Sequence, residues 1–180
     1  MFSSKAILVK LSYQYGVDKM SLLFMRMGFA LPVYATIAFF QFKKKKSEEV
    51  TKKEWGILII IGIIGYYFAS FLDFWGLQYI GAGIERLILF LYPTMTVILG
   101  AIILKKKVTW VQIMAIVVAY IGISIAFWDQ LFVEHNANFW LGAALVFASA
   151  LTFSFYLVGS DKIIPKLGVL KFTSYCMVIS

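Results

Sequence analysis

Long apolar stretches alternate with short polar connections along this chain, and they predict a series of membrane-spanning helices. Five stretches are 18 to 22 residues long, and four of these contain no charged residue. A helix needs about 20 apolar residues to cross about 30 Å of hydrocarbon. The five expected crossings are residues 22–42, 55–72, 87–104, 108–128 and 139–160. Residues 1–15 and 168–180 are expected to be parts of two more helices.

A weak internal repeat relates the two ends of the chain. Residues 10–20 recur at residues 162–172, with an offset of 152. The identical positions are Lys10 and Lys162, Gly16 and Gly168, Val17 and Val169, and Lys19 and Lys171. Four identities among eleven positions also arise by chance in so biased a composition. If the repeat is real, the five intervening crossings invert the second copy in the membrane, as in transporters built from inverted repeats.

The repeat predicts how the chain is divided. Residues 1–128 are expected to form a first five-helix repeat, and residues 138–180 the beginning of a second, inverted one. Subtracting the offset of 152 from the helix start at Asn138 leaves the first helix about fourteen residues short. We therefore interpret the chain as the first half, and slightly more, of a longer protein.

Composition agrees with a bilayer environment. The chain is 62% hydrophobic and only 14% charged, with a mean hydropathy of +0.86, which is more apolar surface than a soluble domain of 180 residues can bury. The predicted fold class is an all-α polytopic membrane protein. It is expected to be a helical bundle of inverted five-helix repeats, of which about six helices and partial ends are present here.

The distribution of lysines predicts the orientation. Twelve lysines fall in alternate connections and in the segment after the last full crossing, whereas the opposite connections contain only Lys19. The twelve are Lys43, Lys44, Lys45, Lys46, Lys52, Lys53, Lys105, Lys106, Lys107, Lys162, Lys166 and Lys171. The lysine-rich side is expected to be cytoplasmic. The net charge of +8 then reflects topology and contact with the lipid bilayer, not nucleic-acid binding, and we expect the inner membrane of a bacterium.

The side chains needed for catalysis are sparse. The chain has a single histidine, His135, and a single cysteine, Cys176. No metal-ligand set, disulfide or Cys/His nucleophile pair can be assembled from them, and no phosphate-binding or dinucleotide-binding glycine motif occurs. We expect no enzyme activity, no metal and no cofactor.

Four charged residues are expected near the external ends of the spans. Arg26 lies about 9 Å into its helix, Asp73 ends the next one, and Glu85 and Arg86 begin the one after. Their charges cancel, which predicts an outer charge cluster, and we hypothesise that Arg26 pairs with Asp73 or Glu85. Alternatively, these residues are interfacial ends stabilised by snorkelling and pairing.

Hydroxyl and aromatic side chains indicate a second candidate region. Ser149, Thr152, Tyr156 and Ser160 share one helix face at spacings of three and four, and they can line a pathway or bond to carbonyl groups of the helices. Aromatic residues can form a cavity wall, namely Tyr66, Tyr67, Phe68, Phe71, Phe74 and Trp75. Pro32 and Pro93 are expected to interrupt their helices, as points of bending or as static kinks.

Three segments resemble a known family. Residues 80–96, 101–110 and 119–124 resemble the fourth and fifth helices of EamA-type proteins of the drug/metabolite transporter superfamily, and the Tyr92-Pro93 pair is the most specific element. The resemblance implies ten helices in two inverted five-helix repeats, with cytoplasmic termini and a central cavity. It also implies movement of small metabolites such as amino acids, often outward. One departure is residues 105–107, three lysines where family members often have Gly-Glu.

Two functions follow as hypotheses. The first is a secondary transporter that exports small amino-acid-like or drug-like solutes by alternating access, with its site near the midplane. The residues expected along its substrate pathway are Tyr66, Tyr92, Ser149, Thr152 and Tyr156. The second is a non-transporting membrane scaffold or sensor subunit derived from a truncated transporter.

Overall fold

The computed structural model describes residues 2–43, 52–126, 128 and 138–179, and these residues form helices with no β-strand. The helices up to the midpoint of the chain are α1 (Phe2–Gln14), α2 (Lys19–Lys43), α3 (Lys52–Gly62), the π-helical turn η1 (Ile63–Phe68), α4 (Ala69–Gly76) and α5 (Ala82–Leu89). The later helices are α6 (Tyr92–Ile103), α7 (Trp110–Ala126), α8 (Phe139–Ser160), α9 (Ile164–Leu167) and α10 (Val169–Ile179). The predicted all-α fold class is confirmed.

Four helical segments of the described chain are long and apolar enough to cross a membrane. They are Met20–Phe40, Trp55–Gly76, Ala82–Ile103 and Phe139–Ser160. Each is 21 or 22 residues long, which matches the thickness of the hydrocarbon layer. The fifth expected crossing, residues 108–128, corresponds to α7, whose 17 described helical residues are apolar but shorter. The chain is therefore a polytopic integral membrane protein.

The expected span at residues 55–72 is one continuous rod that changes its winding in the middle. Regular α-helix in α3 gives way to the six-residue π-helical turn η1 before α4 resumes. The wider π turn inserts an extra residue, so the side chains before and after it face different neighbours. No feature of the hydropathy pattern predicts this turn.

The two prolines differ in their effect on the helices. The apolar run at 87–104 is divided into α5 and α6 by a turn at Phe90 and Leu91, and Pro93 lies in the first turn of α6, where its missing N–H has no helical partner to lose. By contrast, α2 continues through Pro32 to Lys43. Pro32 removes one backbone hydrogen bond while the flanking turns stay helical, and the expected kink at this position stays a prediction.

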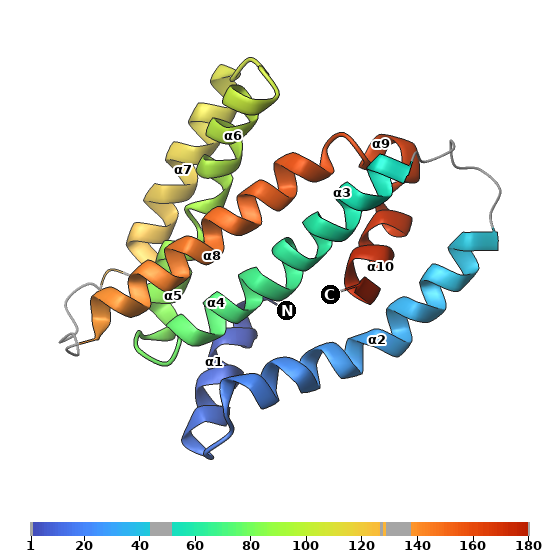
Figure 1. Cartoon of the computed structure of the whole chain (residues 1–180). Coiled ribbons are helices and arrows are strands. Elements are labelled where there is room, and N and C mark those ends of the chain that lie inside the picture. The colour runs from blue at the N-terminus through green and yellow to red at the C-terminus, as the bar shows by residue number, and fades with distance from the viewer. Residues whose placement is uncertain (1, 44–51, 127, 129–137, 180) are drawn as a thin grey trace.

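Helix α8 lies along the α3–η1–α4 rod in antiparallel orientation, and the two are side by side in Figure 1. Glycines allow this close approach. A Cβ atom on Gly76 would meet Val146 at 2.5 Å and the Gly142 carbonyl oxygen at 2.9 Å, and a Cβ atom on Gly65 would overlap the Tyr156 ring. Backbones that approach so closely gain van der Waals contact, which is the main attraction between helices in lipid.

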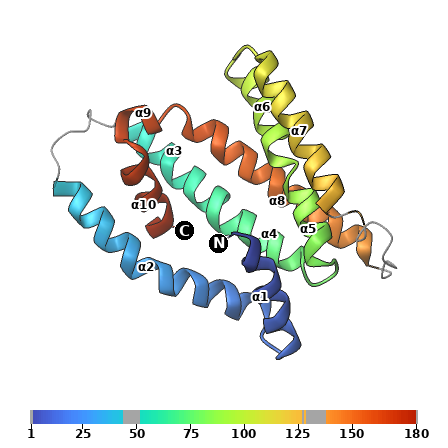
Figure 2. The ribbon, with the colours of Figure 1, turned by 180° about the vertical axis from the view of Figure 1, so that it is seen from behind.

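The remaining helices flank this pair. Helix α10 lies between α2 and α3, and α1 crosses near the start of α2 and contacts α5 (Figure 2). Helices α6 and α7 form a hairpin that extends away from the other helices, with only α6 packed on α8 (Figure 1). Most of the α7 side chains are exposed, including Trp110 and Val118 at 73% and 64%. In a bilayer, such apolar exposure faces lipid or other helices.

Two structural observations bear on the expected repeat and topology. Gly16 and Gly168, which correspond in the repeat, both have positive φ values, +76° and +80°, and each separates two helices.

The ends of α2 and α8 and the start of α3, where lysines are frequent in the sequence, lie at one end of the molecule (Figure 1). Residues 44–46, His135 and Glu134 lie outside the described residues.

Candidate functional site

Two tyrosines from distant parts of the chain meet at the π-helical turn. The Tyr156 hydroxyl of α8 donates a hydrogen bond to the Tyr66 hydroxyl of η1 at 3.3 Å, and the rings pack edge to face with centroids 5.1 Å apart. Tyr66 lies about 16 Å along its span from Trp55, near the middle. The pair therefore places two hydroxyl groups deep within the membrane-spanning part of the chain.

Further aromatic rings extend this pair across four helices. Phe153 stacks on Tyr156 with centroids 5.6 Å apart, and Tyr92 of α6 packs edge to face on Phe153 at 5.5 Å. The ring of Phe172 in α10 also packs on Tyr156, with centroids 6.0 Å apart. The structure thus brings the sequence-predicted Tyr66, Tyr92 and Tyr156 into one connected aromatic cluster, which we call the tyrosine cluster.

The other predicted hydroxyls of α8 bond to the helices. Ser149 is 3% exposed and donates a hydrogen bond to the Ala69 carbonyl of α4 at 2.7 Å. Thr152 bonds to the Ala148 carbonyl within its own helix at 2.7 Å. These are the carbonyl bonds expected from the sequence as the alternative to lining a pathway. Ser149 joins two helices, whereas Thr152 stabilises only its own turn.

Arg26 of α2 lies beside the middle of the α4 helix. Its Nη1 atom donates a hydrogen bond to the Ser70 hydroxyl at 3.1 Å, and its guanidinium carbon lies 5.6 Å from the centre of the Phe74 ring. The Asp73 carboxylate attracts the same guanidinium, and Tyr66 and Tyr34 lie within electrostatic range of it. Arg26 therefore joins α2 to α4, beside the buried Asp73 carboxylate.

The expected pairing of Arg26 with Asp73 or Glu85 stays a prediction, with Asp73 attracting the guanidinium. The hydrogen bond of Arg26 goes to Ser70, and Glu85 forms an ion pair with its neighbour Arg86 at 3.2 Å. Both carboxylates are buried, with Asp73 at 2% and Glu85 at 0% exposure. Glu85 lies in the first turn of α5, where the positive end of the helix dipole favours a negative charge.

Several polar residues near this region were not predicted from the sequence. In α1, Lys10 donates to the Ile80 carbonyl at 2.7 Å and Tyr13 to the Phe74 carbonyl at 2.8 Å. Both bonds satisfy carbonyl groups at or after the end of α4, where the helix has no further donors of its own. The repeat marked Lys10, but nothing in the sequence linked Tyr13, Tyr34 or Ser70 to Arg26.

This arrangement suits recognition of a solute. A guanidinium can bind a carboxylate through two parallel hydrogen bonds, and aromatic rings can contact apolar or cationic parts of the same molecule. Tyrosine hydroxyls add donors and acceptors without charge. These groups can therefore bind a solute within the membrane. Polar residues are rare there, because burying them in hydrocarbon costs free energy.

Comparisons with known proteins agree with a membrane carrier. The model of the EamA-like transporter family matches residues 1–128. An uncharacterized transporter of Bacillus subtilis (strain 168), YcbK, is 25% identical over 178 residues, which cover 98% of this chain and 56% of the relative. A second from the same organism, YyaM, is 31% identical over 156 residues, covering 86% of this chain and 50% of the relative.

A third relative comes from Synechocystis sp. (strain ATCC 27184 / PCC 6803 / Kazusa). The uncharacterized transporter sll1164 is 28% identical over 134 residues, or 72% of this chain and 38% of the relative. The chain thus spans about half the length, or less, of the curated relatives it matches. No solved structure matches it significantly.

Proposed function

The chain belongs to the EamA-like transporter family, and from that premise we propose that it forms part of a secondary transporter that exports small metabolites by alternating access. The family and its transporter relatives support membrane transport, and the structure adds a polytopic helical fold. The proposed location is the inner membrane of a bacterium, with the lysine-rich ends of the helices in the cytoplasm.

The observation that supports a solute site most directly is the position of Arg26. Its guanidinium is partly buried in a membrane-spanning helix, bonds to a serine hydroxyl and lies within electrostatic range of Tyr66 of the tyrosine cluster. A charge placed inside a membrane costs about 2.5 to 3.5 kcal/mol at the bilayer centre, so a functional contact is the default hypothesis. The proposed substrate carries a carboxylate, as amino-acid-like solutes do.

In this proposal, the two predicted groups of residues have separate parts. Arg26 binds the substrate carboxylate, and the tyrosine cluster contacts the rest of the solute. Tyr66 and Tyr92 lie on η1 and α6, which flank α8, so relative movement of these helices would alter the cluster. The break between α5 and α6 at Phe90 and Leu91 provides a place where such movement can occur.

Transport into everted membrane vesicles tests this proposal. Vesicles containing the full-length protein are expected to accumulate one or more solutes from a panel of amino acids, and to lose this activity when ion gradients are collapsed. Arg26→Leu should lower the rate at low substrate concentration about 30-fold or more, because a desolvated charged contact is lost. Arg26→Lys should retain part of the transport rate, because lysine keeps the positive charge but lacks the planar guanidinium that can donate two parallel hydrogen bonds.

Lys19→Leu is the matched control, since Lys19 begins the same helix at its predicted external end. It should leave transport unchanged at equal protein abundance in the membrane. If no solute accumulates under any gradient, the scaffold or sensor hypothesis is favoured. If Arg26→Leu transports like the parent protein, the site lies elsewhere.

A further inference from the structure

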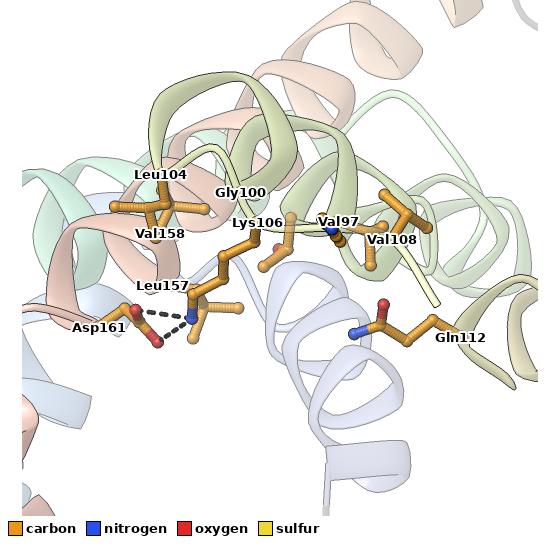
Figure 3. A pocket seen from close by; sticks show the side chains of 11 residues that line it. Val97, Gly100, Leu104, Lys106, Val108, Gln112, Leu157, Val158 and Asp161 are labelled. Carbon is orange, nitrogen blue, oxygen red and sulfur yellow. Dashed lines mark hydrogen bonds and ion pairs between the residues drawn. The ribbon is translucent and has the colours of Figure 1, made fainter. Parts of the chain in front are cut away.

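A pocket of about 200 Å³ lies at the end of α6 that joins the α6–α7 connection (Figure 3). It is bounded by α6, by that connection, by the first turn of α7 and by the last turns of α8. The proposed solute site does not include any of its residues. It lies instead at the lysine-rich end of the helices, where the surface of the bilayer is expected.

Basic groups form one side of this pocket. The Lys106 ammonium lies 2.8 Å from each of the two carboxylate oxygens of Asp161, which follows α8, and Figure 3 shows both contacts. Lys107 also lines the pocket, and Lys105 precedes both lysines with a φ of +52°. Asp161 balances only one of these positive charges. The pocket lining therefore has a net positive charge, and the Asp161 carboxylate is ion-paired with the Lys106 ammonium.

A donor group on α7 faces the same space. The Gln112 side-chain oxygen Oε1 accepts a hydrogen bond from the backbone N–H of Thr109 at 3.0 Å. The Thr109 hydroxyl accepts one from the backbone N–H of Gln112 at 3.4 Å. This reciprocal capping fixes the Gln112 side chain at the start of α7. Its amide nitrogen points toward the interior of the pocket in Figure 3. The N-terminal end of the 17-residue helix α7 also favours a negative charge.

Apolar side chains form the remainder of the lining. Four of the apolar lining residues are Val97 of α6, Leu104 just after it, and Leu157 and Val158 of α8. The neighbouring residues Trp110 and Val111 are 73% and 76% exposed, so the pocket adjoins a surface suited to hydrocarbon. Tryptophan at this level is typical of the membrane interface. The combination of cationic groups, an amide donor and an apolar wall fits an amphipathic anion.

We propose that this pocket binds a phosphate group, supplied by an anionic phospholipid of the surrounding bilayer. The phosphate contacts Lys106, Lys107 and the Gln112 amide, and the glycerol and upper acyl chains contact the apolar wall. Asp161 competes with the phosphate for Lys106, so lipid binding and the link between the α6–α7 connection and α8 exclude each other. The inference needs only membrane insertion, and it does not depend on transport.

Titration of lipid into the detergent-solubilised chain tests the proposal. The probes are dioleoyl phosphatidylglycerol, dioleoyl phosphatidylcholine and inorganic phosphate, with bound lipid counted by native mass spectrometry. We expect phosphatidylglycerol to bind and phosphatidylcholine not to bind. Each lysine contributes about a fivefold effect, so Lys106→Gln with Lys107→Gln should weaken binding about 30-fold. Asp161→Asn should strengthen it, because the competing carboxylate is removed.

Lys162→Gln is the charge-matched control, because Lys162 is exposed beside Asp161 but does not line the pocket. It should bind phosphatidylglycerol like the parent chain. Lys107→Gln alone provides a variant that keeps the Lys106–Asp161 ion pair, in case the double variant misfolds. Equal losses in Lys162→Gln and Lys107→Gln would overturn the pocket as the site. Binding of inorganic phosphate as tight as that of the lipid would overturn the lipid as the source of the phosphate.

Discussion

The hydroxyl of Tyr156 donates a hydrogen bond to the hydroxyl of Tyr66 at 3.3 Å, across ninety positions of sequence. This bond joins the π-helical turn of one membrane span to the helix that follows the family-matched region. Tyr156 is buried and Tyr66 is half-buried, so few other donors compete for this bond. It is therefore both a structural link and a marker of the proposed solute site.

Removal of either hydroxyl should lower stability by a similar, small amount. In membrane proteins, a hydrogen bond between helices contributes about 0.6 kcal/mol, and phenylalanine keeps the ring packing. We expect Tyr66→Phe and Tyr156→Phe to be non-additive, with a coupling of about 0.6 kcal/mol in a double-mutant cycle. Unfolding in mixed micelles measures this coupling. Additive effects of the two changes would show that the hydroxyls do not interact.

Gly65→Ala should destabilise the chain, because a Cβ atom there overlaps the Tyr156 ring. Overpacking of this kind costs about 1–3 kcal/mol. Gly56→Ala is the matched control on the same rod, since no atom lies within 4 Å of its Cβ position. Alanine has a higher helix propensity than glycine, so Gly56→Ala should leave the stability unchanged or raise it slightly. Thermal midpoints in detergent compare the two variants, and equal midpoints would contradict the close packing.

Two hydroxyls on α8 should differ in their contribution to stability. Ser149→Ala removes a bond to the neighbouring α4 helix and should cost about 0.6–1.7 kcal/mol. Thr152→Val removes a bond within α8 and should be close to neutral, since the helix keeps its own backbone bonds. Chemical unfolding of the purified variants measures the difference. A larger loss for Thr152→Val would point to a solute-facing or inter-helix role for Thr152.

Cysteine labelling should place the two ends of α8 on opposite sides of the membrane. The native Cys176 is buried, so Cys176→Ser provides a silent background. Asn138→Cys, at the start of α8, is expected to react with an impermeant thiol reagent from outside intact cells. Lys162→Cys, just after its end, should react only in everted vesicles. The reverse pattern would invert the proposed orientation.

The helical spans could be predicted from the sequence because the bilayer imposes the same rule on every crossing. A run such as residues 139–160, without one charge, has few alternatives to a helix that satisfies its own backbone. The break at Phe90 and Leu91 was harder to place, because both residues are as apolar as the helices on either side. The π-helical turn escaped prediction because its residues are ordinary helix and sheet formers, and its register depends on packing against α8.

The candidate site could be predicted only in part. Aromatic and hydroxyl residues at membrane depth pointed to Tyr66, Tyr92 and Tyr156, and the structure brings these three together. The hydrogen bond from Arg26 to Ser70 could not be predicted, since opposite charge drew attention to the carboxylates and not to a neutral hydroxyl. Such choices depend on how two helices are rotated against each other, which hydropathy does not record.

The close seating of α8 on α4 has a consequence for biosynthesis. The family match ends at residue 128, before α8 begins. Even so, α8 packs on residues inside the matched region: Gly142 and Val146 lie against Gly76, and Ser149 bonds to Ala69. A ribosome delivers α4 to the membrane before α8, so the α4 side of this contact is already in place when α8 enters. If the gene were cut at residue 128 and the two pieces were co-expressed, this contact should allow them to reassemble.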